Sequence, residues 1–311
     1  MDKYDFLLLK FAEYLAINNF SERTIANYTQ NVRYFFEYLK SQGIENIMEA
    51  DRQTVSGYQA AVYMQTFKGK PLSPVTQRGR INAIKALYRY LIKNNLAHYD
   101  PTSSLSLPKC PSRLPRNILS KKEVGRLLSA PSLETPAGLR DRAILELFYA
   151  TGVRTSELCN LTINDIDLNG GELRINQGKN AKDRIVPLGE AAREYLEAYL
   201  KEARPKLAGP GNLVLFATKS GRKFRRSDLS AILKKYAEKA GIKKFSPYTL
   251  RHTCATHLLK GKAGIRHIQQ LLGHSSVATT QRYTRVEIAD LKQVLKRCHP
   301  RSRKEIDACE I

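Results

Sequence analysis

The stretch "ATGVRTSELCNLT", residues 150–162, joins the end of one predicted helix to the start of another. Gly152 is the residue type that ends a helix, and Thr155 is a suitable N-cap for the helix that begins at "TSEL". Arg154 lies at this junction, where its guanidinium can donate two parallel hydrogen bonds to an oxyanion. Surface arginines beside turns are common, so the segment alone does not establish an anion site. Glu157 either orients Arg154 or only stabilises the helix N-terminus.

The sequence on either side of this stretch predicts mixed α and β structure. Amphipathic runs predict helices at 120–130, 138–152 and 190–205. Short runs predict a β-hairpin made of strands 173–176 and 184–188, and one more strand at 213–218. From about residue 225 onward only helices are expected.

The first part of the chain, residues 1–97, predicts helices only. Ser21 is a suitable N-cap for one amphipathic helix, and Ser73 followed by Pro74 begins another. The second of these helices has a basic face, which carries Arg78, Arg80, Lys85 and Arg89. In a chain this basic, contact with phosphate groups and plain solvation are about equally good interpretations of that face.

A proline-rich segment, residues 98–117, separates the two patterns. Its prolines exclude a helix and favour an extended, semi-rigid path. We therefore predict a helical domain over 1–97, a linker over 98–117, a second domain over 118–298 and a C-terminal tail over 299–311.

The charge of the chain is strongly unbalanced. Its 311 residues include 52 Lys and Arg but only 29 Asp and Glu, a formal net charge of +23. Such an excess predicts an anionic partner, most simply nucleic acid. A membrane surface is the alternative, but the sequence has no basic amphipathic anchor and no long apolar run.

Compartment signals are consistent with a cytoplasmic protein. The 5 cysteines are scattered and odd in number, which favours reduced thiols over a disulfide framework. The apolar patch near the N-terminus is too short, and its flanks too acidic, for a secretory signal. We expect a cytoplasmic location.

Two segments of the second domain carry further candidate residues. Lys179 lies in the predicted hairpin turn, where it can reach a phosphate, although a lysine that only keeps the turn soluble is the simpler interpretation. Lys182 is a second candidate in that turn. Tyr248 and Arg251 are three residues apart on the helix that Ser246 and Pro247 begin, so they are expected to share a face.

A metal site is not expected. His252 and His257 are five residues apart, which places them about 140° apart around a helix, so they do not share a zinc ion without distortion. We interpret both, with Cys254 between them, as helix-packing residues. The sequence also has no P-loop, HExxH motif or aspartate cluster, so neither a metal nor a nucleotide cofactor is predicted.

The segment "GHSSVATTQRYT", residues 273–284, contains almost nothing that could fill a core. It places Tyr283 nine residues after His274. In this order and at these spacings, the segments resemble the tyrosine recombinase (phage integrase) family, most closely its Xer-like and simple integrase branch. The resemblance spans nearly the whole chain and rests on "SERTIANYTQNVRYFFEYL", "ATGVRTSELCNLTINDID", "GKNAKDRIVPLG", "YTLRHTCATHLL" and "IQQLLGHSSVATTQRYT".

The resemblance implies a fold and a reaction. The fold would be mainly α with a small β-sheet (α+β), an all-helical SAM-like core-binding domain and a mixed α/β catalytic domain that form a C-shaped clamp on DNA. Tyr283 would attack a backbone phosphate, leaving a 3′-phosphotyrosine and a free 5′-hydroxyl. Arg154 and Arg251 would hold the non-bridging oxygens, Lys179 would protonate the departing oxygen, and His274 would hydrogen-bond the phosphate.

One position departs from the family pattern. Tyr248 stands where the family usually has histidine, and a phenol donates a hydrogen bond but is a poorer base at neutral pH. We expect activity with an altered pH dependence. An inactive relic is the alternative, against which the other matching positions argue.

The resemblance also implies partners. Double-stranded DNA would be bound partly by four of the basic residues of segment 219–235, namely Arg222, Lys223, Arg225 and Arg226. A homotetramer on two duplexes would form through the helix after Tyr283, unless that helix packs on its own domain. An accessory protein or second recombinase, and the choice among integration, transposition and dimer resolution, are left open.

We therefore predict a site-specific recombinase that exchanges strands through a Holliday junction without metal or ATP. Two alternatives are a type IB topoisomerase-like nicking enzyme and a non-catalytic DNA-binding protein. The second alternative predicts salt-sensitive binding without a covalent adduct.

Overall fold

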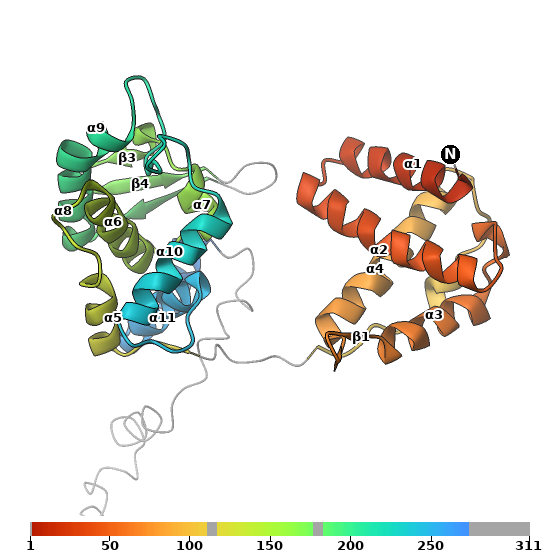
Figure 1. The fold of residues 1–311 in the computed structure, drawn as a ribbon. Helices are drawn as coiled ribbons and strands as arrows, with labels where there is room; N and C mark the ends of the chain where they lie inside the picture. Colours follow the sequence, from red (N-terminus) through yellow and green to blue (C-terminus); the bar gives the residue numbers. More distant parts are fainter. Residues whose placement is uncertain (1, 111–116, 177–182, 274–311) are drawn as a thin grey trace, which may run out of the picture. The chain divides into compact units, whose positions relative to one another are not determined.

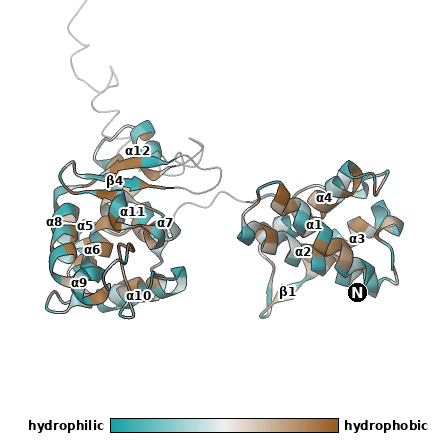
Figure 2. Cartoon of the chain, turned by 90° about the horizontal axis from the view of Figure 1, so that it is seen from above, coloured by the Kyte–Doolittle hydropathy of each residue, from teal (hydrophilic) through white to brown (hydrophobic). Residues whose placement is uncertain are grey.

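The computed structural model describes residues 2–110, 117–176 and 183–273. The chain divides into two compact units, Met1–Ser112 and Arg113–Ile311. Each unit has its own hydrophobic core (Figure 2), formed mostly by helix faces in the first unit and by helix and strand faces in the second. In the part of the chain that is described, no helix combines the length and the apolar character needed to span a bilayer.

The first unit is a bundle of four α-helices (Figure 1). The predicted caps Ser21 and Ser73 are confirmed, since their hydroxyls accept hydrogen bonds from Thr24 N and Thr76 N, each at 3.2 Å. Helices α1, α2 and α4 pack against one another, and their aromatic residues fill the core. The elements are α1 (Lys3–Ile17), α2 (Glu22–Ser41), η1 (Ile47–Glu49), α3 (Arg52–Met64), α4 (Pro74–Lys93) and η2 (Pro101–Ser104).

A short β-hairpin interrupts this helical unit. Strand β1 (Thr66–Phe67) pairs antiparallel with β2 (Lys70–Pro71). The tip residues Lys68 and Gly69 both have positive φ, 51° and 73°, a conformation that closes a tight turn between antiparallel strands. The prediction of helices only for this part of the chain missed the hairpin.

Helix α6 forms the centre of the second unit. It is buried along most of its length and packs against α5, α8, α9 and α11 (Figure 1). Pro136 begins α6 and Gly152, with φ of 59°, ends it. The elements of this layer are α5 (Lys121–Leu128), α6 (Pro136–Thr151), α7 (Thr155–Asn160), η3 (Ile163–Asp165), α8 (Glu190–Ala198), the π-helix η4 (Tyr199–Ala203), α9 (Arg204–Leu207), α10 (Arg226–Lys239), α11 (Pro247–Lys260) and α12 (Ile265–Leu272).

A three-stranded antiparallel sheet, ordered β3-β4-β5, completes the unit. Strands β4 (Glu172–Ile175) and β5 (Arg184–Pro187) form the predicted hairpin, and β3 (Ile166–Asp167) is an additional edge strand. Alternation along the strands buries Leu173, Ile175 and Val186 and leaves Ile185 63% exposed. One face of the sheet therefore contributes to the core, and the other faces solvent.

The strand predicted at 213–218 is wrong. This segment forms only isolated bridges, Thr162↔Val214 and Ala217↔Lys223. Arg204 explains part of the difference, because its guanidinium donates hydrogen bonds to the carbonyls of Asn212 and Val214. Carbonyls bound to a side chain cannot also continue a ladder in the same direction.

Candidate active site

Arg154 and Glu157 form the start of α7. Arg154 has the extended conformation of an N-cap, and Glu157 Oε2 accepts a hydrogen bond from Arg154 N at 2.7 Å. Glu157 Oε1 also accepts from Arg154 Nη1 at 2.6 Å. The prediction of Thr155 as the N-cap is wrong, because Thr155 is already helical and the capping carboxylate comes from Glu157 instead.

Arg251 lies on α11 and is only 4% exposed. Its Nη2 donates to Leu272 O at 2.7 Å, and its Nη1 donates to Gly152 O. The backbone at Gly152 is left-handed, and an added Cβ would lie 2.6 Å from Leu272 Cδ2. Glycine is therefore required here both for its conformation and for the close approach of α12.

The end of α12 brings the two predicted arginines together. Arg154 Nη2 donates to Gly273 O at 2.7 Å, next to the Leu272 carbonyl that Arg251 contacts. A third arginine, Arg184 on β5, donates to Leu271 O at 3.1 Å. The last carbonyls of a helix have no intrahelical partner and carry partial negative charge, so they attract this cationic cluster. The cluster has one carboxylate, Glu157, and is net positive.

Arg184 was missed in the sequence. Its side chain donates from Nη1 and Nη2 to both oxygens of Glu157, at 3.1 and 2.9 Å. Period-two alternation with the buried Val186 is the signal that could have placed it on the core face. Burial alone would raise the pKa of Glu157, but hydrogen bonds from Arg184 and Arg154 outweigh it and hold the pKa below its ordinary value.

The remaining predicted catalytic residues are placed differently. Tyr248 lies in the first turn of α11 and is 61% exposed, and its ring is 6.4 Å from that of His252. Tyr248 does not share the burial of Arg251, although the two residues are three apart on the helix. Lys179, His274 and Tyr283 lie outside the described residues.

His257 and Cys254 pack as interior residues of α11. His257 Nδ1 lies 2.8 Å from Tyr149 Oη on α6, and Cys254 is buried next to the carbonyl of Ala150. Burial raises the pKa of the Cys254 thiol to about 12, so it stays protonated at neutral pH. Among the described residues, no three His, Cys, Asp or Glu side chains are grouped so as to hold a metal ion.

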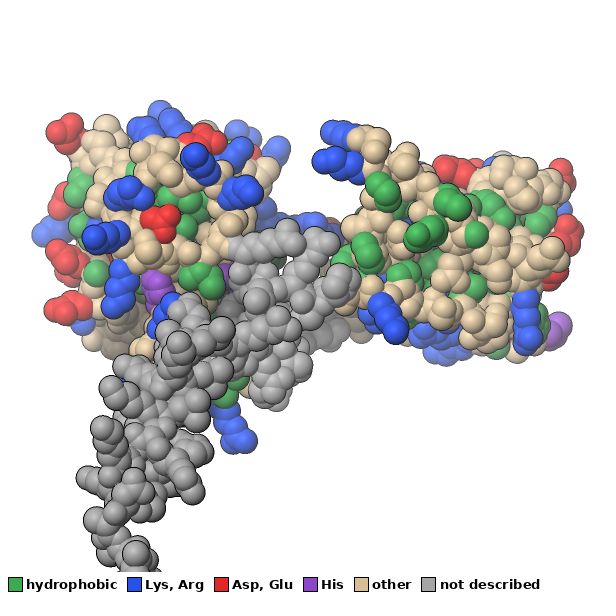
Figure 3. All heavy atoms as spheres, turned by 90° about the horizontal axis from the view of Figure 1, so that it is seen from below, with side chains coloured by type: hydrophobic (Ala, Val, Ile, Leu, Met, Phe, Trp, Pro, Cys, Tyr) green, Lys and Arg blue, Asp and Glu red, His purple; other side chains and the backbone are tan. Residues whose placement is uncertain are grey.

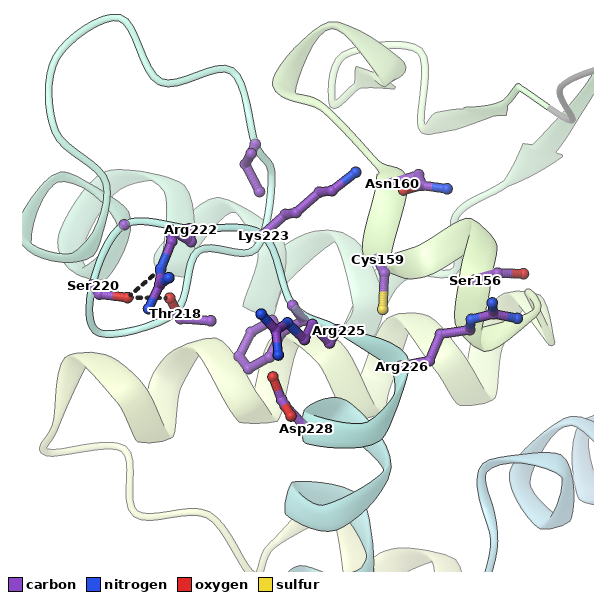
Figure 4. A pocket seen from close by; sticks show the side chains of 13 residues that line it. Ser156, Cys159, Asn160, Thr218, Ser220, Arg222, Lys223, Arg225, Arg226 and Asp228 are labelled. Carbon is purple, nitrogen blue, oxygen red and sulfur yellow. Dashed lines mark hydrogen bonds between the residues drawn. The ribbon is translucent and has the colours of Figure 1, made fainter. Parts of the chain in front are cut away.

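A basic hollow of about 960 Å³ lies between α7 and the segment before α10 (Figure 4). All four predicted DNA-binding residues of this region line it, namely Arg222, Lys223, Arg225 and Arg226. Ser156 and Asn160 of α7 line the opposite wall, and Lys223 extends toward Asn160. Cys159 also lines the hollow, but burial raises the pKa of its thiol to about 11, which keeps it protonated. Lysine and arginine side chains are also spread over a visible face of this unit (Figure 3).

The predicted basic face of α4 divides into two parts. Arg78 and Arg89 are exposed, and Lys85 is half-buried with its Nζ 2.7 Å from Leu105 O. Arg80 is 8% exposed, because its guanidinium lies over the Tyr34 ring and donates to Gln65. Arg80 follows Arg78 by two residues, so it lies about 200° away from Arg78 around the helix axis, which explains why Arg80 points into the unit.

Comparison with known families identifies the class of protein. The model of the "Phage integrase family" matches residues 117–289, and that of the "Phage integrase, N-terminal SAM-like domain" matches residues 7–98. The chain therefore belongs to the phage integrase, or tyrosine recombinase, family. It is an enzyme of site-specific DNA recombination, as the motifs predicted, and its fold class is confirmed.

The relatives are Xer recombinases. Tyrosine recombinase XerC 2 of Ralstonia nicotianae is 37% identical over 290 residues, which cover 93% of this chain and 84% of the relative. Tyrosine recombinase XerD of Listeria monocytogenes serotype 4b is 37% identical over 301 residues, 95% of this chain and 99% of the relative. The predicted Xer-like character is thus confirmed.

Solved structures agree with this assignment. The crystal structure of XerA recombinase is 32% identical, with a TM-score of 0.54, and the match covers 96% of this chain and 99% of that one. The Tn1549 transposon integrase, in complex with a circular intermediate DNA, has a TM-score of 0.73 at 18% identity, with 94% and 99% covered. The second likeness concerns the fold alone.

Proposed function

We propose that this recombinase cleaves and rejoins DNA through Tyr283, exchanging strands through a Holliday junction without metal or ATP. The observation that carries the proposal is the arginine cluster at the end of α12. Arg154 and Arg251 reach this point from different helices, and both contact the carbonyls that immediately precede His274. A phosphate bound beside residue 274 would therefore meet two fixed guanidinium groups.

Arg154 and Arg251 would stabilise the transition state of cleavage. Attack on a phosphodiester places additional negative charge on the non-bridging oxygens, and donors fixed beforehand stabilise that charge without reorganisation. Arg154 is about a third exposed, with 34% of its side chain accessible, and its contacts to Glu157 and Gly273 leave further N–H donors. Arg251 is buried and would act from beneath the phosphate.

Proton transfer during cleavage would involve residues outside the described part of the chain. Tyr283 would give its proton to a neighbouring acceptor as it attacks the phosphorus, and the 3′-phosphotyrosine bond that forms would conserve the energy of the P–O5′ bond that breaks. Lys179 would protonate the departing 5′-oxygen. His274 would hydrogen-bond the phosphate. Tyr248, at the position of the family's histidine, would donate a hydrogen bond and give the reaction a different pH dependence.

DNA would be bound by basic residues of both units. Support comes from the exposed Arg78 and Arg89 of α4 and from the hollow that Lys223 and its arginine neighbours line. Lys85 would add to the α4 face, whereas Arg80 is engaged inside its unit. We propose that the domain of residues 1–97 and the domain of residues 118–298 clamp one duplex, with the linker of residues 98–117 crossing it.

The active assembly would be a homotetramer on two duplexes. One solved structure of similar fold is a lambda integrase tetramer bound to a Holliday junction, which motivates this proposal. The helix that the sequence predicts after Tyr283 would dock on a neighbouring copy. The DNA site would determine whether a second recombinase or an accessory protein takes part. We place the protein in the cytoplasm, on the nucleoid of a bacterium or archaeon, because its relatives are bacterial recombinases.

Covalent trapping tests the proposed chemistry. A pool of nicked duplexes, including the DNA that flanks the gene, is incubated with the wild-type chain or with Tyr283→Phe, denatured and separated on a gel. We expect a shifted, protease-sensitive band with the wild type, absent with Tyr283→Phe. Sequencing the trapped DNA would then give the cleavage site.

The same experiment separates the alternatives. Tight, salt-sensitive binding without an adduct, in both the wild type and Tyr248→His, would contradict the proposal and leave a non-catalytic DNA-binding protein. Relaxation of supercoils on any sequence, without a preferred site, would instead favour the topoisomerase-like alternative. An adduct formed only by Tyr248→His would identify an inactive relic.

A further inference from the structure

Strand alternation fixes the direction of the Arg184 side chain. Arg184 pairs with Ile175 across the β4–β5 ladder and lies two residues before Val186, which is fully buried. Residues two apart on a strand share a face, so Arg184 points into the unit. Arg174 on β4 pairs with the exposed Ile185 and points out, where it forms an exposed ion pair with Asp183.

Arg184 and Glu157 form a buried, two-pronged pair. Their side chains are 9% and 8% exposed, and both Nη atoms of Arg184 reach a carboxylate oxygen. A buried carboxylate is stable only when its charge is compensated and its oxygens accept hydrogen bonds. Arg154 provides a second partner, but 34% of its side chain is accessible to solvent.

The shared carboxylate links the two arginines. Glu157 Oε1 accepts from Arg154 and from Arg184, so movement of the carboxylate would move the guanidinium of Arg154 with it. Arg184 also donates to Leu271 O, two residues before the carbonyl that Arg154 contacts. It therefore holds both the carboxylate and the end of α12.

We propose that Arg184 is a positioning residue for DNA strand cleavage, which holds Glu157 and, through it, the phosphate-binding guanidinium of Arg154. This inference rests on the proposed function. Arg184 would touch neither the DNA nor the reacting atoms. Its planar fork supplies hydrogen bonds to three oxygens, and a lysine ammonium, a single point charge on a flexible stem, would not reproduce that geometry.

The first measurement is the single-turnover rate of adduct formation on a duplex that the wild type cleaves. Arg184→Met should lower this rate by about 100-fold and Arg184→Lys by about 10-fold, while DNA affinity is retained, because misplacing a catalytic group acts on the chemical step. Arg174→Met is the matched control on the neighbouring strand and should cleave like the wild type. A wild-type rate for Arg184→Met, or an equal loss of affinity, would overturn the inference.

A double-mutant cycle identifies the route of the effect. If Arg184 acts through Glu157, adding Arg184→Met to Glu157→Gln should lower the rate little further. Independent, multiplying losses would show that Arg184 supports the fold generally and would overturn the positioning role. Arg184→Lys, which keeps the positive charge, serves in the cycle if Arg184→Met does not fold.

Amide hydrogen exchange of the DNA-free chain tests whether Arg184 holds Glu157 in place, without a measurement of catalysis. Arg154 N–H donates to Glu157, so its amide should exchange faster in Arg184→Met and Arg184→Lys than in the wild type or in Arg174→Met. Unchanged exchange at this amide would overturn the inference. Absence of an adduct with the wild type, together with faster exchange in the variants, would overturn the proposed function and leave the hold of Arg184 on Glu157 intact.

Discussion

At the scale of single residues, Gly152 controls how closely α12 approaches the arginines. Its left-handed backbone ends α6 and turns its carbonyl toward Arg251. Leu272 packs where a Cβ would project from Gly152, and Leu272 itself is fully buried. A side chain at this position would therefore displace the end of α12, and with it the carbonyls that Arg154 and Arg251 contact.

Gly152→Ala should destabilise the second unit more than Gly241→Ala does. Both glycines have positive φ, 59° and 75°, so both variants should lose roughly 1–2 kcal/mol of unfolding free energy to backbone strain. A Cβ at Gly241 meets nothing within 4 Å, whereas the clash at Gly152 should cost roughly a further 1–3 kcal/mol. Thermal unfolding of the two variants measures the difference, and equal losses would contradict it.

Residue types at fixed spacing predicted Arg154, Glu157 and Arg251, because short-range junctions and a family motif place them. Arg184 could not be recognised in the same way. Alternation with Val186 could have placed its side chain on the core face, but its partner Glu157 lies 27 residues away in the chain, and no local pattern predicts that contact. The burial of Arg251 could not be predicted from the sequence either, because the carbonyl groups that accept its hydrogen bonds belong to residues far from it in the chain.

At the scale of elements, helices were predicted better than strands. Caps such as Ser21, Ser73 and Ser246 act within one turn, so local sequence identifies them. The segment 213–218 has a strand-like composition, but its partners are a loop and the side chain of Arg204. Edge strands of two residues, such as β1 and β3, depend on turns and partners more than on their own residues.

The contact between α6 and α11 should make stability depend on pH. Burial lowers the pKa of His257 below its ordinary value of 6.5 in the folded chain; a hydrogen bond with the Leu119 backbone acts against this, and repulsion from Lys121 and Lys260 adds to it. The unfolded chain therefore takes up a proton first, and the contribution of neutral His257 is complete above about pH 6.5 and decreases as the pH falls toward the folded pKa. His257 Nδ1 and Tyr149 Oη share a hydrogen bond at this contact.

Melting temperatures of the wild type and His257→Gln, compared between pH 7.5 and 5.5 (about one unit on either side of the ordinary histidine pKa), measure this contribution. The wild type should lose more of its stability than the variant as the pH is lowered. Other titrating groups affect both chains alike and cancel in the comparison. Parallel losses in the two chains would show that His257 does not carry the pH dependence.

At the scale of the whole molecule, basic side chains are divided between two separately folded units. The net charge of +23 belongs to the chain as a whole, but the exposed basic residues that we propose to contact DNA lie on α4 of one unit and around the hollow of the other. Each unit has a core of its own, so a substitution on the surface of one should leave the other unchanged.

The salt dependence of DNA binding should include contributions from phosphate contacts of both units. Each phosphate contact contributes about 0.9 to the slope of log K against log salt concentration. Arg78→Ala and Lys223→Ala should each lower the slope by about 1, and the double variant by about 2, because both units would grip one duplex. Lys201→Ala, an exposed lysine that does not line the hollow, is the control for net charge and should leave the slope unchanged. A slope that responds to Lys223→Ala but not to Arg78→Ala would mean that α4 does not meet the phosphates, and that the first unit binds DNA by another face.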